Sequence, residues 1–365
     1  MARDLPVLFC YAQARGRALV DRLQGKRPLF VCVVAHTDTV EIPGLSAAGA
    51  TPELRTYTPA ADAEALFYGR ARCIPGGVPA NPLGPPGPVL ITMAALRLAS
   101  IPFFVVDAGC RVAPDAPVIA LGEGPGGNIT TGEAVPEARR IFERGVALGR
   151  ALAPLADYLV VGESVPGGTT TALALLLALG YDAEGKVSSS MAAGPHDLKV
   201  AVARQALAAA GIRPPSDPLR AVAGVGDPMQ AAVAGLVLGA LHRVPVVLAG
   251  GSQMAAVLAL LVGLARQRGQ ALDPDQVAVA TTRWVATDPA SDVAGLMAQI
   301  GDFPLLASAL SFAEARHAPL RRYEEYLVKE GVGAGGAAVA AALRAGCSAT
   351  DLLRAVERVY EELFG

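Results

Sequence analysis

The chain has 365 residues, of which 52% are apolar and 5% aromatic, and its formal net charge is −2. This length suits one large α/β domain, or one large and one small domain. Because the sequence holds no block of basic residues, nucleic acid and anionic membranes are excluded as expected partners.

The cysteines and the apolar segments indicate the cellular compartment in which the protein is expected. Five cysteines are scattered without a C-x-x-C pair, which argues against a disulfide scaffold or a zinc site. The first residues show no signal-peptide pattern, and the most apolar region, 231–265, is interrupted by His242, Arg243 and Pro245. We therefore expect a cytoplasmic protein without a membrane span.

Short apolar runs that alternate with helical segments predict an α/β fold. Residues 1–28 are predicted as a helix, and strands are predicted at 29–35, 103–107, 158–161, 245–251 and 277–281. Helices are predicted at 62–68, 88–100, 136–155, 198–210, 254–264 and 337–343, and the irregular stretch 50–88 as a functional loop or a dimer arm. We expect a three-layer α/β/α sandwich with a mostly parallel, Rossmann-like sheet (29–329) and a smaller helical part (1–28 and 330–365).

The stretch 157–180 organises the chain. An apolar run of strand type leads to Gly162 and the carboxylate Glu163, and a glycine turn then opens a long apolar helix at Thr169. A helix N-terminus offers free N–H donors and a partial positive charge, and glycines let a phosphate approach the backbone. The pattern favours an anion site. The alternative is a buried βα turn in which Glu163 only caps the helix.

Later turns repeat this design. Gly250 and Gly251 end a predicted strand, and Glu330 lies among glycines ahead of an Ala-rich helix. Lys199 opens another helix behind three serines and can supply a point charge to an anion, although a solvated surface lysine is the alternative. Because such turns gather at the carboxyl edge of a parallel sheet, we expect Glu163 and Glu330 in one cleft.

One motif indicates a different chemistry. Residues 122–127, G-E-G-P-G-G, have the G-x-G-x-x-G form of dinucleotide-binding folds. Those folds require a helix to begin at the glycines, whereas the loop-like segment 128–132 follows here. An NAD-dependent oxidoreductase is therefore the weaker alternative.

Taken together, the turns resemble the nicotinate-nucleotide:dimethylbenzimidazole phosphoribosyltransferase superfamily. The family's G-E-M-G-I-G-N-T-T is similar to 162–170, its G-G-F-E to 250–253 and its E-G-T-G-A to 330–334. Its anion-contacting lysine falls near Lys199. Order and spacing agree from about residue 100 to 345, whereas the first hundred residues fit poorly, so the chain looks like a divergent branch of this superfamily.

The resemblance implies a reaction. Phosphoribose would move from nicotinate mononucleotide to an aromatic base, such as dimethylbenzimidazole or a purine, to give an α-ribazole-type nucleotide for the lower ligand of a cobamide. Glu330 and Glu163 would be catalytic, with Glu330 as the base that takes the acceptor's proton. Because the leaving group is already a cationic pyridinium, no metal or other cofactor is expected. The resemblance implies small-molecule substrates and a homodimer, and a non-catalytic nucleotide-binding protein is the alternative.

The resemblance also implies binding residues. The segment that faces the base in the family is similar to 35–46, where polar residues follow a predicted strand, which implies base contacts from Asp38, Glu41 and Ser46. An ordinary polar loop is the alternative for this segment. The implied phosphate-binding residues are Gly167, Gly168, Thr169, Thr170, Gly194, Lys199, Gly250 and Gly251.

Overall fold

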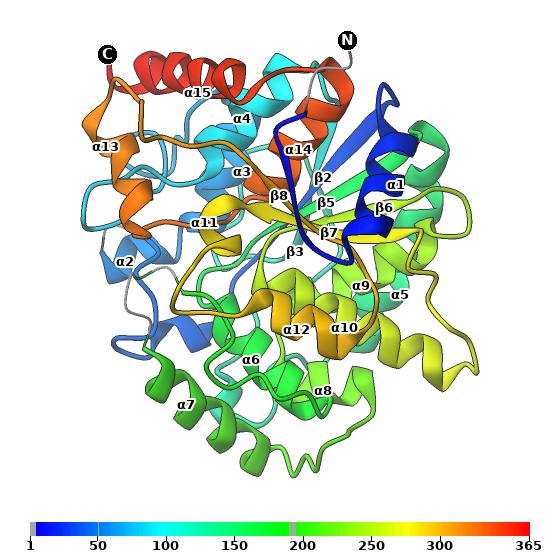
Figure 1. The fold of residues 1–365 in the computed structure, drawn as a ribbon. Coiled ribbons are helices and arrows are strands. Elements are labelled where there is room, and N and C mark those ends of the chain that lie inside the picture. The colour runs from blue at the N-terminus through cyan, green and yellow to red at the C-terminus, as the bar shows by residue number, and fades with distance from the viewer. Residues whose placement is uncertain (1–4, 50, 190, 192–194) are drawn as a thin grey trace.

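A computed structural model describes residues 5–49, 51–189, 191 and 195–365, which form one eight-stranded sheet flanked by helices (Figure 1). The strands are β1 Val7–Tyr11, β2 Pro28–Ala35, β3 Phe103–Gly109, β4 Val118–Ala120, β5 Tyr158–Ser164, β6 Val246–Ala249, β7 Val277–Thr282 and β8 Leu305–Ser308. Their order across the sheet is β1-β8-β7-β6-β5-β2-β3-β4. Every neighbouring pair is parallel except β1 with β8.

Helices cover both faces of the sheet (Figure 1). One face carries α5 Ala138–Leu152, α6 Gly168–Ala178, α7 His196–Ala209, α8 Pro218–Val225, α9 Pro228–Ala240, α10 Ser252–Gln267 and α12 Val293–Ile300. The other carries α1 Gln13–Leu23, α3 Thr58–Tyr68, α4 Val89–Leu98, α14 Ala334–Ala345 and α15 Ala349–Phe364. Short turns complete the list: α2 Pro52–Arg55, α11 Arg283–Ala286, α13 Ala318–Arg321, η1 Asp38–Glu41, η2 Ile129–Thr131, η3 Ala153–Leu155 and η4 Arg322–Glu325.

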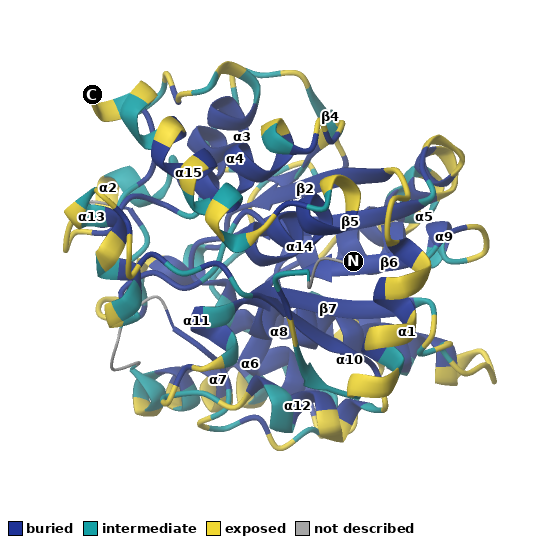
Figure 2. Cartoon of the chain, turned by 45° about the horizontal axis from the view of Figure 1, so that its top comes forward, coloured by how far each residue is buried: buried dark blue, intermediate teal, exposed yellow. Residues whose placement is uncertain are grey.

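The hydrophobic core therefore has two halves, one on each side of the sheet. Successive strand residues face opposite sides. Val31 and Val33 of β2 therefore belong to the core half that contains α5, α6, α9 and α10, while Cys32 and Val34 belong to the half that contains α4 and α14. All eight residues of β2 are buried, and the central strands are dark in Figure 2. Burial on both faces explains the continuous apolar runs in the sequence. The predicted three-layer α/β/α class is confirmed.

The N-terminal prediction was wrong. Residues 1–28 were predicted as a helix, but Val7–Tyr11 forms the edge strand β1, and the helix α1 begins only at Gln13. The five residues V-L-F-C-Y are β-branched, aromatic or apolar, so they favour a strand, and only half of a short edge strand needs to be buried. Five residues are too few to show the two-residue repeat of a strand, and the helical pattern that follows them dominates the sequence signal.

The division of the chain into a large part and a smaller helical part stays a proposal. Both segments assigned to the smaller part pack on the common sheet: β1 pairs with β8, and α14 contacts β5, β6, β7 and β8. Among the described residues, no helix is long and apolar enough to cross a membrane.

The chain changes sides between β2 and β5. After β2 it runs to α3 and α4 on one face, whereas after β5 it runs to α6 on the other. The two strands are neighbours in the sheet, so the connections that follow them leave toward opposite faces at this point. Open α/β sheets bind ligands at such a switch point.

Candidate active site

A cavity lies at the carboxyl ends of β5, β6 and β7. It is enclosed by the turn after β5, the start of α10, the turn before α14, and the helix α3. Seven of the residues predicted from the sequence line it, namely Ser46, Glu163, Gly167, Gly168, Thr169, Gly251 and Glu330. The structure thus brings together turns that are far apart in the sequence.

The turn before α6 has the geometry of an anion site. Gly167 has a φ of 81° at the N-cap of α6, a backbone conformation that favours glycine. Within the described residues, the backbone N–H groups of Gly167 and Thr169 have no hydrogen-bond partner. A Cβ on Gly168 would come within 2.0 Å of Oε1 of Gln253, so a larger residue there would displace the Gln253 side chain. Free donors at a helix N-terminus attract a phosphate.

Lys199 reaches this turn from α7. Its Nζ donates to Oγ1 of Thr169 at 2.8 Å and to the carbonyl of Ser188 at 2.9 Å, and the side chain is buried. Burial, together with the charge of the nearby Lys329, lowers the pKa of Lys199 to about 7, and Asp288 opposes the shift. An ammonium held against a helix N-terminus is suited to an anion such as a phosphate.

The pH dependence of phosphate binding follows from this pKa. Above pH 7 the free protein loses the Lys199 ammonium, so the Kd for nicotinate mononucleotide should rise with pH, by about tenfold per unit at most. Calorimetric titration between pH 6 and 9 measures this. In Lys199→Ala the rise should disappear, and an equal rise in that variant would contradict the assignment.

The remaining predicted phosphate contacts lie differently. Thr170 is fully buried behind the turn and does not line the cavity, and its N–H donates to the carbonyl of Gly167. Gly250, with a φ of 159°, precedes Gly251 at the start of α10, beside Glu163. Gly194 lies outside the described residues.

Glu330 is fixed by hydrogen bonds between the end of β7 and the start of α14. One carboxylate oxygen accepts from Oγ1 of Thr281 at 2.9 Å and from the N–H of Thr282 at 2.8 Å. The other accepts from the N–H groups of Gly331 and Gly335 at 3.2 and 3.1 Å. Burial of the carboxyl group raises the pKa of Glu330, and these hydrogen bonds oppose the rise.

Glu163 is the last residue but one of β5, and its exposed fraction is 2%. Burial raises its pKa well above the usual range, and the charges of Glu330 and Asp227 raise it further. One oxygen accepts from the N–H of Val165 at 3.2 Å. The two carboxyl groups therefore differ: Glu163 favours the protonated form, while four donors stabilise the anion of Glu330.

The two acidic segments are joined through their backbones. The N–H of Val332 donates to the carbonyl of Glu163 at 2.7 Å, and a Cβ on Gly162 would lie 2.8 Å from the Cα of Gly333. Gly331, Val332 and Gly333 all have positive φ values, of 147°, 54° and 64°. Such a conformation is rare for valine and marks a turn that its surroundings hold in place.

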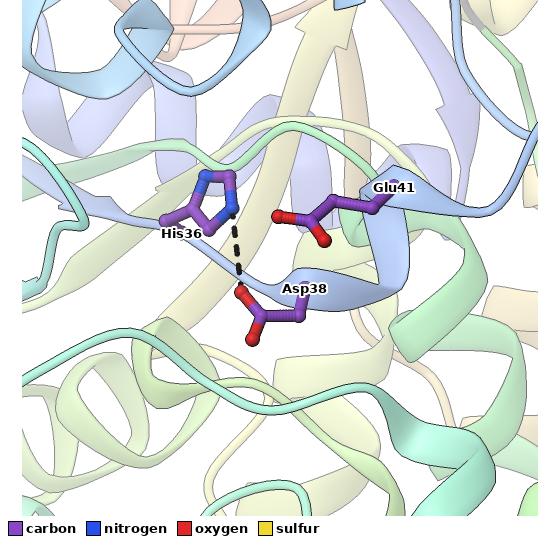
Figure 3. Close-up of side chains that lie close together, drawn as sticks. All are labelled: His36, Asp38 and Glu41. Atoms are coloured by element: carbon purple, nitrogen blue, oxygen red, sulfur yellow. Dashed lines mark ion pairs between the residues drawn. The ribbon is translucent and has the colours of Figure 1, made fainter. Parts of the chain in front are cut away.

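Two of the three predicted base contacts lie away from the cavity. Ser46 lines it, whereas Asp38 and Glu41 of η1 lie together with His36 beside the end of β2 (Figure 3). The possible ligand atoms of these three residues lie within 4.8 Å of one another, and Nε2 of His36 is 3.7 Å from Oδ1 of Asp38. The guanidinium of Arg111 pairs with Asp38 and supplies positive charge there. The prediction that the reaction needs no metal stays a prediction.

Comparisons with known proteins give the family. The UPF0284 protein glr4139 of Gloeobacter violaceus is 47% identical over 98% of this chain and 94% of its own length. A UPF0284 protein of Methanothermobacter thermautotrophicus is 49% identical over 86% of this chain and 88% of its own. The chain belongs to the UPF0284 family. A family profile described as phosphoribosyltransferase matches residues 91–268, which include the turn before α6 and Lys199.

Solved structures show where the UPF0284 fold belongs. CobT from Thermus thermophilus has a TM-score of 0.60 at 24% identity, covering 94% of this chain and 89% of that one. The nicotinate-nucleotide-dimethylbenzimidazole phosphoribosyltransferase of the same organism has a TM-score of 0.57 at 23% identity, covering 94% of each chain. The resemblance inferred from the sequence, to a divergent branch of this superfamily, is confirmed.

The glycine-rich segment 122–127 has a structural task in this UPF0284 protein. No helix begins there, and α5 starts only at Ala138. Instead the N–H of Gly126 donates to the carbonyl of His36, and the carbonyl of Gly126 accepts from the N–H of Asp38. A Cβ on Gly122 would lie 1.9 Å from the carbonyl oxygen of Ala108. The segment therefore holds the chain in place just after β2. A dinucleotide site would need a helix that begins at these glycines, and none begins there.

The sequence analysis missed an ion pair in the cavity wall. Nζ of Lys329 lies 2.6 Å from Oδ2 of Asp288, both side chains are almost fully buried, and Lys329 lines the cavity. Asp288 also accepts from Oγ of Ser188, whose carbonyl accepts from Lys199. The two partners are 41 residues apart in the sequence, so their pairing could not be predicted from it. The one sequence signal was that Lys329 directly precedes Glu330, a predicted site residue.

Asp288→Asn should destabilise the protein by about 3 kcal/mol or more, because it leaves a buried ammonium without its counter-ion. Urea denaturation measures this loss. The matched control is Asp275→Asn, which removes the exposed partner of Arg15 and should cost about 1 kcal/mol or less. Equal losses in the two variants would contradict the role given to the buried pair.

Proposed function

We propose that this protein is a phosphoribosyltransferase that moves 5-phosphoribose from nicotinate mononucleotide to a ring nitrogen of an aromatic base. One observation carries the proposal: the helix N-terminus at Gly167–Thr169 lines one cavity with the carboxyl groups of Glu163 and Glu330, and the buried Lys199 bonds to Thr169 at the edge of that cavity. The phosphoribosyltransferase profile and the fold shared with the Thermus enzymes support the reaction class. The proposed product is an α-ribazole-type nucleotide for the lower ligand of a cobamide.

The 5′-phosphate would be held at the turn before α6. The free N–H groups of Gly167 and Thr169 would donate to its oxygens, and Lys199 would add a charge-assisted hydrogen bond. Ser188 and Ser189 line the same end of the cavity and offer hydroxyl groups. These contacts bind the donor in the ground and transition states alike, so they mainly lower KM.

The chemical step would take place between the two carboxyl groups. A ring nitrogen of the acceptor attacks C1′ of the ribose, the bond from C1′ to the nicotinate nitrogen breaks, and its electron pair returns to the pyridine ring. The acceptor's N–H proton passes to the carboxylate of Glu330, which is the ionised member of the pair. Glu163, protonated in its buried position, would hydrogen-bond to the ribose hydroxyls.

A non-catalytic nucleotide-binding protein is the alternative from another class. Carboxyl groups beside an anion site weaken anion binding unless they have a task, and Glu163 and Glu330 are among those that line this cavity. We also propose a homodimer located in the cytoplasm, as expected from the sequence.

The test incubates the purified protein with nicotinate mononucleotide and a panel of benzimidazoles and purines. Mass spectrometry follows the release of nicotinate and the formation of new nucleotides. Base-dependent release supports the proposal. Tight binding of nicotinate mononucleotide without release from any base would favour the non-catalytic alternative, and a titratable dinucleotide would favour an oxidoreductase.

A further inference from the structure

A third carboxyl group lines the cavity, beside those of Glu163 and Glu330. Asp62 of α3 is 3% exposed, and its Oδ2 accepts from Oγ of Ser164 at 2.7 Å. Its Oδ1 has no hydrogen-bond partner among the described residues. Oγ1 of Thr58, one helical turn earlier, also lacks a partner, and all three residues line the cavity. Buried polar atoms without partners are uncommon in folded proteins, so a ligand that completes them gains affinity.

The helix that carries these atoms lies on the other side of the sheet from the phosphate turn. The helix α3 belongs to the core half that contains α4 and α14, whereas α6 and α7 belong to the other half (Figure 1). Thr58 and Asp62 are four residues apart, so both face the sheet from one side of α3. Glu163 precedes Ser164 on β5, and both residues line the cavity.

This arrangement orients the substrates. If the 5′-phosphate binds at α6 as proposed, the ribose would lie beside Glu163, and the acceptor would approach C1′ from the side of α3. The acceptor then meets Oδ1 of Asp62, an oxygen with a free lone pair. Burial raises the pKa of Asp62 to about 7, and the hydrogen bond from Ser164 opposes the rise, so above neutral pH the group is a carboxylate that only accepts.

We propose that Thr58 and Asp62 form the acceptor subsite, and that it selects an aromatic nitrogen base carrying an exocyclic hydrogen-bond donor, such as an amino or hydroxyl group. The inference rests on the proposed transferase activity and names its second substrate by chemical class. A base with a hydrogen or methyl group at that position leaves Oδ1 desolvated and unpaired. A site built to hydrogen-bond a substituent strongly rejects an analogue that lacks it.

The test compares matched pairs of bases at pH 8: adenine with purine, and 5-hydroxybenzimidazole with 5-methylbenzimidazole. With nicotinate mononucleotide as donor, the wild-type kcat/KM should be higher for the donor-bearing member by about tenfold or more in at least one pair. In Asp62→Ala that ratio should fall to near one, while the Kd for nicotinate mononucleotide stays the same. Asp62→Asn keeps the size of the side chain and should lower the ratio severalfold. This variant can be tested if Asp62→Ala does not fold.

The outcomes separate this inference from the proposed function. If the wild type reacts with bases but treats the members of both pairs equally, or if the variants keep the wild-type ratio, Asp62 does not select the acceptor and the transferase assignment stands. If no base releases nicotinate, the transferase assignment fails and the subsite falls with it. A fall in the ratio that is accompanied by weaker donor binding would show a structural role for Asp62 and overturn the inference.

Discussion

Replacing Glu330 by glutamine is expected to lower kcat by about a hundredfold or more, the usual contribution of a positioned general base. Glutamine keeps the size of the side chain but cannot take the acceptor's proton. Steady-state kinetics with the best acceptor base measures the loss. Binding of nicotinate mononucleotide should change little, because the phosphate contacts lie at the turn before α6.

Two controls separate chemistry from folding. Glutamine presents an amide where Gly331 and Gly335 donate to the carboxylate, so the Tm of the variant must be measured beside its kcat. Glu325→Gln, an exposed change five residues earlier, should leave both values unchanged. The loss should shrink for bases that are already largely deprotonated. Near-normal turnover of Glu330→Gln on its best base would refute the role and make Glu163 the next candidate.

Lys199→Ala is expected to raise the KM for nicotinate mononucleotide by about ten- to hundredfold, the range of one charge-assisted hydrogen bond. The ammonium binds the phosphate in the ground and transition states alike, so kcat should change little. Lys186→Ala is the matched control, because the ammonium of that lysine pairs with Asp182 on the surface, whereas that of Lys199 bonds to Thr169 in the turn before α6. A fall in kcat with unchanged KM would instead place Lys199 at the reacting atoms.

The fold could be predicted because its strongest signals are local. Continuous apolar runs such as 29–35 indicate strands buried on both faces, and the structure has β2 at Pro28–Ala35. Strands β1, β4 and β8 were not predicted; they have five, three and four residues, and β1 and β4 lie at the edges of the sheet. Short runs of this kind show no clear period, and a neighbouring helix obscures them.

Apart from Ser46, which the resemblance implied, the candidate site could be predicted where glycine turns precede helices. That pattern indicated Glu163, Gly168 and Glu330, which line one cavity. It could not indicate Asp62, which lies in α3, within the stretch 50–88 that was predicted as irregular apart from a short helix, or the pairing of Lys329 with Asp288. Contacts between side chains on separate elements depend on tertiary packing, and a single sequence does not specify them.

The backbone hydrogen bond from Val332 to the carbonyl of Glu163 has a consequence for titration. It holds the two acidic segments on one rigid unit, so neither carboxyl group can move away when the other ionises. The protons of such a pair leave in two macroscopic steps that belong to the pair and not to either residue. The acidic limb of the pH–rate profile should therefore shift when Glu163 is replaced by glutamine, although Glu330 remains in place.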